Sequence, residues 1–240
     1  MKGKNKFLKI SLTAAVMLLG ILFVAIFGGP ELLKAYIRVG IGGCDKIPIL
    51  CMMPREQAIS AEPDPDFLGQ LVRYKFPKIT ALLPKGFNVV HERIKKVYYK
   101  RQKRTGNKPV IYLLYQKPDY FVKLFPNLRK QGVGDDYEFL RRTMYADINA
   151  IKTITDAFFV IMKGIFVPDI GEQADAKMMK FTVRDKRGFI NFNLTGKGNY
   201  FDCNVFDARG DYFKIYIKDI NARLNLSNVL TIISAIEGAE

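Results

Sequence analysis

The fold is dictated by residues 178–218, which read MMKFTVRDKRGFINFNLTGKGNYFDCNVFDARGDYFKIYIK. Apolar and polar side chains alternate through this stretch, as at 213–217, and a period of two residues is typical of a β-strand with one buried face. Turn-forming residues at 185–188, 196–199 and 208–210 divide the stretch into four such runs. The sequence therefore predicts a four-stranded antiparallel meander.

The two faces of this meander differ in chemistry. The apolar face suits a protein core, and Cys203 within it is expected to be a buried, inert thiol. The other face carries polar and tyrosine side chains, namely Lys180, Arg184, Asn191, Asn193, Asp202, Asn204, Tyr212, Lys214, Tyr216 and Lys218. Tyrosine contributes contact area and a hydrogen bond at low entropic cost, so this face is a candidate recognition surface. The alternatives are a wetted face without function and a face covered by a helix.

Helices are predicted before and after the meander. Residues 144–165 carry apolar side chains at steps of three and four, and a shorter pattern of this kind covers 118–130. A last helix is expected at 227–237, after the N-cap residue Asn225. The predicted fold class is α+β, with an antiparallel sheet flanked by helices in a domain that spans 77–240.

An earlier part of the sheet is predicted ahead of these helices. Residues 79–90 indicate a strand interrupted by a turn at Pro84-Lys85-Gly86. Residues 93–100 and 110–116 are rich in Val, Ile, Tyr and Leu, with turn chemistry between them. That pattern predicts a hairpin.

The order of these motifs resembles the PsbP-like family of α/β/α sandwich proteins. The similarity is carried by Leu83-Pro84-Lys85-Gly86-Phe87 ahead of a hairpin, by the late meander and by the apolar helix at 229–236. It covers chiefly 80–120 and 178–237, and the long helix predicted at 144–165 departs from it. The resemblance implies a non-enzymatic accessory or binding role on an extracytoplasmic membrane face.

The N-terminal region contains an uncharged apolar run from Ile10 to Phe27. As a helix it would be roughly 27 Å long, close to the hydrocarbon thickness of a bilayer. Four lysines and no acid precede it, so the positive-inside rule places the N-terminus in the cytoplasm and the following domain outside. Residues 1–29 are therefore expected to be a cytoplasmic tip and transmembrane anchor. A cleaved signal peptide and a buried core helix are the alternatives.

Residues 30–76 are expected to be a juxtamembrane segment and linker, because Gly and Pro recur in them. Apolar residues at helical spacing near their start, including Leu32 and Ile37, favour a short amphipathic helix at the membrane surface. Cys44 and Cys51 flank a short loop, and an oxidising compartment would permit a disulfide between them. Two unpaired thiols are the alternative.

The densest cluster of charge lies in the predicted hairpin. Eight cations occur there without an acid, namely Arg93, Lys95, Lys96, Lys100, Arg101, Lys103, Arg104 and Lys108. At about 1 kcal/mol for each basic residue near an anionic surface, four of them would contribute about 4 kcal/mol to membrane binding. A solvated hairpin tip is the alternative. The whole chain carries a net charge of +15, and an extracytoplasmic location argues against nucleic acid as its partner.

Recognisable catalytic and metal-binding signatures are lacking in the sequence. His91 is the sole histidine, and the three cysteines form no C-x-x-C pair, so neither a metal site nor a cofactor is predicted. We therefore expect a membrane-anchored extracytoplasmic accessory or binding module, non-enzymatic, whose partners are the membrane and another membrane or envelope protein. The alternatives are an electrostatic membrane clamp through residues 93–108 and an enzyme with an unrecognised site. The sequence does not indicate the oligomeric state.

Overall fold

A computed structural model of the chain describes residues 29–40, 42–91, 108–167, 176–194 and 198–238. The apolar run on which the anchor prediction depends lies outside these residues, as does the first arm of the predicted hairpin. No helix in the described part of the chain is long and apolar enough to cross a membrane.

The chain divides into two compact units. The first comprises Met1–Cys51 and Ala146–Phe166, and the second comprises Met52–Tyr145 and Val167–Glu240. This division differs from the predicted boundary at residue 77. The segment after Met52, expected to be linker, instead contributes two strands and a helix to the second unit.

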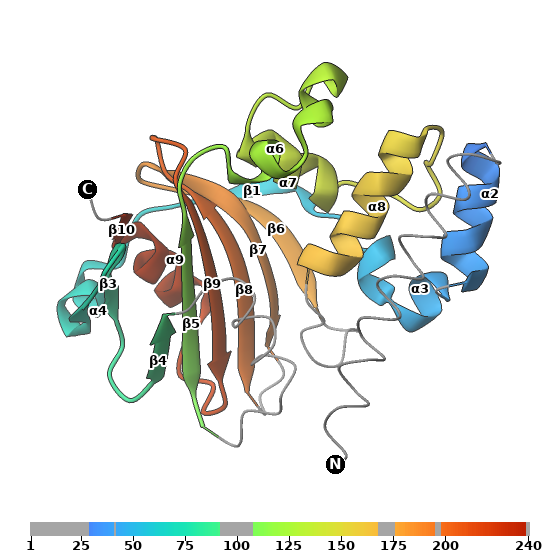
Figure 1. Cartoon of the computed structure of the whole chain (residues 1–240). Coiled ribbons are helices and arrows are strands. Elements are labelled where there is room, and N and C mark those ends of the chain that lie inside the picture. The colour runs from blue at the N-terminus through green and yellow to red at the C-terminus, as the bar shows by residue number, and fades with distance from the viewer. Residues whose placement is uncertain (1–28, 41, 92–107, 168–175, 195–197, 239–240) are drawn as a thin grey trace, which may run out of the picture. The chain divides into compact units, whose positions relative to one another are not determined.

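The second unit is built around a seven-stranded sheet with the order β1-β6-β7-β8-β9-β5-β4 (Figure 1). Its strands are β1 (Arg55–Ala61), β4 (Asn88–His91), β5 (Val110–Gln116), β6 (Lys177–Val183), β7 (Lys186–Leu194), β8 (Asn199–Phe206) and β9 (Tyr212–Asp219). Strands β6 to β9 pair antiparallel in sequence order, which confirms the predicted meander. The sheet as a whole is mixed, because β1 pairs parallel with β6 and β4 pairs parallel with β5.

The apolar face of the large sheet packs against a helix and a second sheet. The second sheet is antiparallel with the order β10-β3-β2, formed by β2 (Val72–Phe76), β3 (Ile79–Leu83) and β10 (Ile236–Gly238). The helix is α9 (Leu226–Ser234), which begins with a capping box between Asn225 and Asn228. Together they enclose the main core, in which Phe213 and Cys203 are fully buried. The short helix α4 (Pro65–Gln70) begins at its N-cap residue Asp64.

Two predictions in this region need correction. The last helix ends at Ser234 and not at residue 237, because Ile236 starts β10 and pairs with Ala81. The predicted strand at 79–90 is two strands, and they belong to different sheets. The turn at Pro84-Lys85-Gly86, in which Gly86 has a φ of 84°, carries the chain from one sheet to the other.

The opposite face of the large sheet is covered at one end by two short helices, α6 (Tyr120–Leu124) and α7 (Asp136–Met144). Phe121 of α6 meets the ring of Tyr212 edge-on at 5.1 Å, and Tyr137 of α7 stacks on Phe189 at 5.7 Å. The helix predicted at 118–130 is broken at Phe125, after which Pro126–Gln131 continues as a 3₁₀ helix. Proline lacks the backbone N–H that a continuing α-helix needs there.

The long helix predicted at 144–165 is also wrong. The chain forms α7 up to Met144, then an irregular connection, then α8 (Ile154–Phe166) in the first unit. The connection is stabilised by Asp147, whose carboxylate accepts a hydrogen bond from the backbone N–H of Asn149 at 2.8 Å. Thr153 and Asp156 then exchange reciprocal capping hydrogen bonds of 2.8 and 3.1 Å, which start α8.

The first unit is helical in its described part. It contains α2 (Pro30–Ala35), a π-helical segment (Tyr36–Gly40), α3 (Gly43–Lys46), a 3₁₀ helix (Pro48–Cys51) and α8. Leu33 and Ile37 are buried in a cluster with Leu50 and with Ala157 and Val160 of α8. A disulfide joins Cys44 to Cys51, with a Cα–Cα distance of 5.7 Å.

Candidate functional site

The predicted recognition face of the meander lies in the second unit, and it is not the open polar surface that the sequence suggested. Most of its side chains are buried, including those of Asn191, Asn193, Tyr212, Lys214 and Tyr216. Lys180 and Lys218 are half-buried, and Arg184 is exposed. Part of the reason is the helical layer of α6 and α7, whose aromatic side chains cover the end of the face that includes Tyr212.

The buried polar side chains form a network across β8 and β9. Lys214 donates hydrogen bonds from Nζ to the carboxylate of Asp202 and, at 3.0 Å, to Oδ1 of Asn204. The hydroxyl of Tyr212 donates to the same Asn204 oxygen at 2.8 Å. Asn191 lies opposite Asp202 on the neighbouring strand, and within the described part of the chain its buried amide has no hydrogen-bond partner. This region is polar but closely packed, and it contains a buried charge pair.

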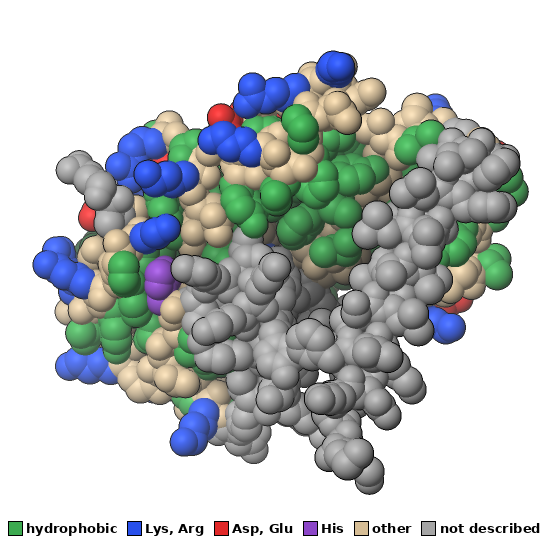
Figure 2. Space-filling view, viewed as in Figure 1, with side chains coloured by type: hydrophobic (Ala, Val, Ile, Leu, Met, Phe, Trp, Pro, Cys, Tyr) green, Lys and Arg blue, Asp and Glu red, His purple; other side chains and the backbone are tan. Residues whose placement is uncertain are grey.

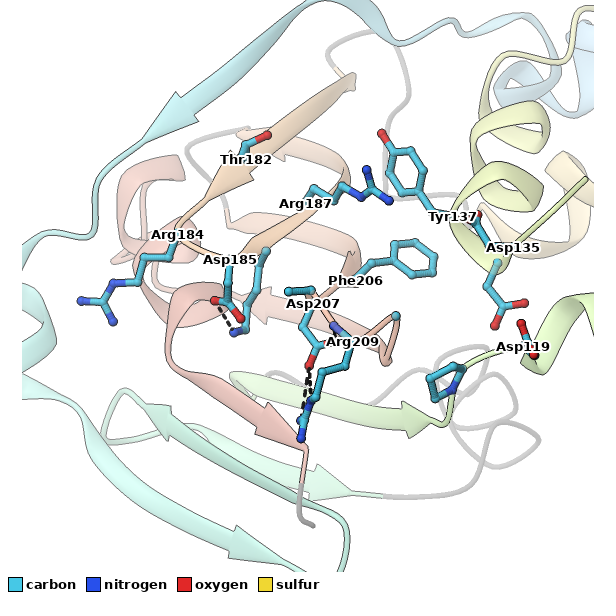
Figure 3. A pocket seen from close by; sticks show the side chains of 15 residues that line it. Asp119, Asp135, Tyr137, Thr182, Arg184, Asp185, Arg187, Phe206, Asp207 and Arg209 are labelled. Carbon is cyan, nitrogen blue, oxygen red and sulfur yellow. Dashed lines mark hydrogen bonds and ion pairs between the residues drawn. The ribbon is translucent and has the colours of Figure 1, made fainter.

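A cavity of about 590 Å³ lies in the second unit, at the end of the sheet where the hairpin turns occur (Figure 3). One side is formed by the β6–β7 turn, with Arg184 and Asp185, and by the β8–β9 turn from Asp207 to Gly210. Pro118 and Asp119, just before α6, and the first residues of α7 form the other side. Four separate parts of the chain therefore meet around this cavity.

The cavity is lined by charges of both signs. Its cations are Arg184, Lys186, Arg187 and Arg209, and its acids are Asp119, Asp135, Asp136, Asp185 and Asp207. Figure 3 shows Arg187 extending toward Tyr137, whereas Arg184 extends away from both at the rim. The guanidinium carbon of Arg187 lies 4.1 Å from the centre of the Tyr137 ring. That arrangement is a cation–π contact.

Asp136, at the edge of this cavity, stabilises the start of α6. Its buried carboxylate accepts hydrogen bonds from the backbone N–H groups of Tyr120, Phe121 and Val122, at 2.6, 2.8 and 3.1 Å. It therefore caps the first turn of α6 from a distant position in the sequence. Burial raises the pKa of Asp136, while the three N–H groups act in the opposite direction.

A second network borders the β8–β9 turn. Arg209 forms ion pairs with Asp207 at 3.4 Å and with Asp211 at 3.1 Å. The hydroxyl of Tyr115 donates to Asp211 at 2.9 Å. Burial, followed by this hydrogen bond, raises the pKa of Tyr115 to about 12, so the phenol stays protonated at neutral pH. These contacts hold the β8–β9 turn in place, and they give the carboxylates of Asp207 and Asp211 partners within the protein.

A Ser–His or Cys–His pair is not found among the residues that line the cavity. Thr182 provides the one hydroxyl of a Ser or Thr, and the lining contains neither Cys nor His. His91 lies on β4, where its ring stacks on Phe76 at 5.0 Å, and burial followed by the nearby Lys78 lowers its pKa. In the part of the chain that the structure describes, no three His, Cys, Asp or Glu side chains are close enough to hold a metal ion.

Of the predicted membrane-binding cations, Arg93 to Arg104 lie outside the described residues and Lys108 is exposed. The sequence did not predict a role in the site for Arg187, Tyr137 or Arg209. Arg187 and Arg209 stand in or beside turns, which gave a weak signal. The contact of Arg187 with Tyr137 depends on tertiary structure, because about forty residues separate α7 from β7 in the chain.

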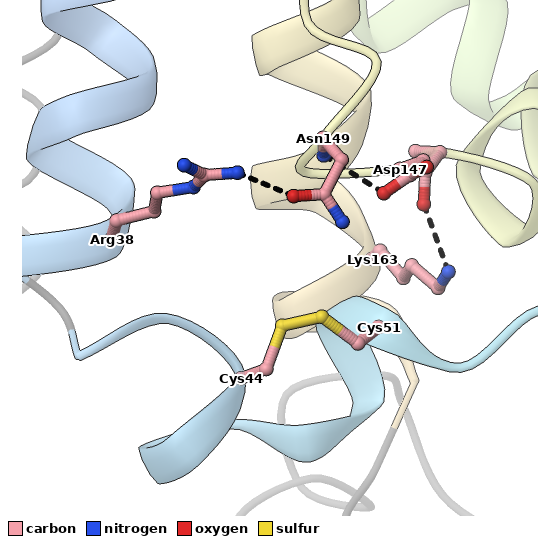
Figure 4. The surroundings of a disulfide bond; sticks show 7 residues. Arg38, Cys44, Cys51, Asp147, Asn149 and Lys163 are labelled. Carbon is pink, nitrogen blue, oxygen red and sulfur yellow. Dashed lines mark hydrogen bonds between the residues drawn. A yellow bond between two sulfur atoms is a disulfide. The ribbon is translucent and has the colours of Figure 1, made fainter.

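The first unit contains a buried lysine beside its disulfide (Figure 4). Lys163 of α8 is fully buried and donates from Nζ to the carbonyl oxygen of Ala146 at 2.9 Å. Burial lowers its pKa to about 8, and the nearby Asp147 opposes the shift. This acceptor is a backbone carbonyl at the start of the α7–α8 connection, so the hydrogen bond joins that connection to α8.

Comparison of the chain with protein-family models, with curated proteins and with solved structures gives no match. The resemblance to the PsbP-like family therefore stays a prediction.

Proposed function

We propose that this protein is a membrane-anchored extracytoplasmic binding module, non-enzymatic, that holds a segment of another membrane or envelope protein in the cavity at the turn end of its sheet. The observation that carries the proposal is the cavity itself, about 590 Å³ and lined by side chains of both charges. Binding sites are usually concave, and the charged lining of this cavity suits a polar segment. Its lining contains no Ser, Cys or His that could form the nucleophile and base of a Ser–His or Cys–His acyl transferase.

Two features support an extracytoplasmic location. The bond between Cys44 and Cys51 is of a kind that persists in oxidising compartments and is rare in the cytosol. The apolar run from Ile10 to Phe27, preceded by lysines, has the composition of an N-in, C-out anchor. Alkylation of Cys44 and Cys51 in intact cells tests this part, since free thiols at both positions would place the first unit in a reducing compartment.

The first helix of the described chain fits a place beside the membrane. α2 begins two residues after Gly28, close to the end of the apolar run. Leu32 and Val39 are 58% and 83% exposed, whereas Leu33 and Ile37 on the same segment are buried. Exposed apolar side chains next to a membrane anchor can enter the interfacial layer of the bilayer.

The surface charge suits an anionic partner. The chain carries a net charge of +15, and Figure 2 shows many Lys and Arg side chains and few Asp or Glu side chains on the face it presents. Attraction between surfaces of opposite charge raises association rates. An acidic protein surface is therefore a suitable partner.

Site-specific photo-crosslinking tests the binding role. A photoreactive residue replaces Thr182, which is exposed and lines the cavity, and in a control it replaces the exposed Ser227 at the start of α9. Irradiation of native membranes should give one protein adduct at position 182 and none at position 227. Equal adducts at both positions, or none at either, would contradict a cavity-bound partner.

The membrane clamp is distinguished from this role by removing positive charge from residues 93–108. The variant changes six cations to Gln, namely Lys95, Lys96, Lys100, Arg101, Lys103 and Arg104. A binding module would keep the position-182 adduct in this variant. If the protein is an electrostatic clamp, the six-Gln variant would lose its binding to anionic vesicles. The parent chain would then give no adduct at position 182.

A further inference from the structure

The hydrogen-bonding capacity of the cavity is more informative than its formal charge. Each of the five acids that line it has a partner in the protein. Three of them accept hydrogen bonds from backbone N–H groups, namely Asp136, Asp207 and Asp135, the last from Glu138 at 2.7 Å. The other two form ion pairs, Asp185 with Lys186 at 3.0 Å and Asp119 with Arg129 at 3.5 Å. Each acid of the cavity therefore already has a partner within the protein.

Its donors are engaged less completely. Lys186 and Arg209 are held by the acids beside them. Arg184 and Arg187 form no ion pair with any residue in the described ranges. Arg184 and Arg187 are therefore the spare donors of the cavity, which favours a ligand that brings acceptor atoms.

Arg187 is positioned by an aromatic ring that is itself fixed. Tyr137 lies against Phe189 at 5.7 Å and meets Phe206 edge-on at 5.5 Å, so both strands β7 and β8 hold the ring. The guanidinium of Arg187 lies 4.1 Å from the centre of that ring. A guanidinium that lies against an aromatic ring can still direct its N–H groups sideways to a bidentate acceptor.

We infer that Arg187 and Tyr137 form a subsite for a carboxylate, and that the cavity takes an acidic side chain of the partner polypeptide. This inference rests on the proposed function and specifies the chemistry of its ligand. A carboxylate is planar and matches the two parallel N–H groups of a guanidinium. It also carries a single charge, which suits a cavity lined by five acids better than the doubly charged phosphate does.

Binding of short peptides to the full chain in a non-ionic detergent tests the subsite. The probe is acetyl-tetraglutamate amide, and the uncharged control peptide is acetyl-tetraglutamine amide. Arg187→Gln should weaken tetraglutamate binding about tenfold or more, and Arg187→Lys about threefold, because a lysine keeps the charge and loses the bidentate geometry. Arg73→Gln, a matched loss of one exposed arginine on β2 of the small sheet, should leave the affinity within about twofold.

Several outcomes would overturn the subsite. These are no measurable binding of tetraglutamate by the parent chain, equal binding of tetraglutamine, and equal weakening by Arg187→Gln and Arg73→Gln. Competition by inorganic phosphate at concentrations equal to those of the peptide would assign the site to phosphate instead. The thermal unfolding of each variant is measured beside the parent, since Arg187 is exposed and its loss should leave the fold intact.

The two proposals fail separately. A position-182 adduct that persists in Arg187→Gln, with unchanged peptide affinity, would keep the binding module and remove the carboxylate subsite. Tetraglutamate binding that depends on Arg187, without any adduct in native membranes, would keep the subsite and remove the protein partner.

Discussion

Lys214 on β9 and Asp202 on β8 form an ion pair inside the protein, with their side chains 3% and 0% exposed. Both residues come from the polar face of the meander, where the sequence suggested contact with water or a ligand. A buried pair is costly to desolvate, and its geometry must be good to offset that cost. Lys214 also donates a hydrogen bond to Asn204, which accepts another from Tyr212, so the buried amine has a second acceptor beside Asp202.

Removal of one partner of this pair should destabilise the second unit strongly. Asp202→Asn leaves the lysine charge buried without its carboxylate, and a loss of about 3 kcal/mol is expected. The double variant Asp202→Leu/Lys214→Met should recover most of that loss, because two apolar side chains of similar size leave no buried charge. Urea unfolding of the three proteins measures this. A single variant as stable as the parent would show that the pair is exposed to water in solution.

Gly188 provides a test of the β7–β8 register. A Cβ at this position would lie 1.9 Å from the backbone oxygen of Asn204, which cannot move without displacing β8. Gly188→Ala should therefore cost about 3 kcal/mol or more. Gly69→Ala is the matched control, since Gly69 lies in α4 with nothing within 4 Å of its added Cβ, and it should be neutral or slightly stabilising. Comparable stability of the two variants would mean that the strands pair differently.

The parts of the fold that the sequence predicted correctly are those with local signals. The alternation in 178–218 depends on neighbouring side chains only, and it located all four strands of the meander. Parallel pairing has no such signal. Arg55 of β1 pairs with Met179 of β6, more than a hundred residues away. The sequence of neither strand indicates which strand it pairs with.

The interruption before α8 did carry a local signal. Thr153-Ile154-Thr155-Asp156 has the Ser/Thr-x-x-Asp/Glu spacing of a capping box, which marks a helix start inside the apolar pattern at 144–165. Ile148 and Ile151 of the connection are apolar because they are buried, and their separation of three residues happens to match the spacing of a helix. For the cavity, no comparable signal existed, because Tyr137 and Arg187 are brought together by the packing of α7 on β7 and β8.

Lys163 should make the stability of the first unit depend on pH. Its pKa is about 8 in the fold, below the ordinary value of 10.5. Between these two values the unfolded chain holds the proton and the folded chain does not, so stability rises with pH in that window. Below pH 8 both states are protonated, and the cost of burying the charge is fully present.

The expected gain from pH 8 to pH 10.5 is up to about 3 kcal/mol, since one pKa unit corresponds to about 1.4 kcal/mol. Lys163→Met should abolish the rise and should be more stable than the parent at pH 7. Lys152→Met, at an exposed position just before α8, should keep it. Chemical unfolding at several pH values compares the three proteins, and a parent curve that is flat or falling across this window would contradict a buried neutral amine.

Arg184 combines an unfavourable backbone with a place at the rim of the cavity. It occupies the first position of the two-residue turn between Val183 and Lys186, and its φ is 52°, a region that favours glycine. Ala222 has a similar φ of 50° and is not among the cavity-lining residues. The two positions therefore share one kind of strain, and only the first has a proposed role in binding.

Replacement of either residue by glycine should relieve the strain and raise stability by up to about 1 kcal/mol. Arg184→Gly should also weaken tetraglutamate binding about threefold at low salt, because the rim guanidinium attracts the anionic peptide over a distance. Ala222→Gly should leave binding unchanged. Thermal unfolding measures the stability of both variants, and peptide titration measures their affinity for tetraglutamate. Equal stabilisation with equal affinity would show that an arginine at this turn serves neither the fold nor the binding of an acidic ligand.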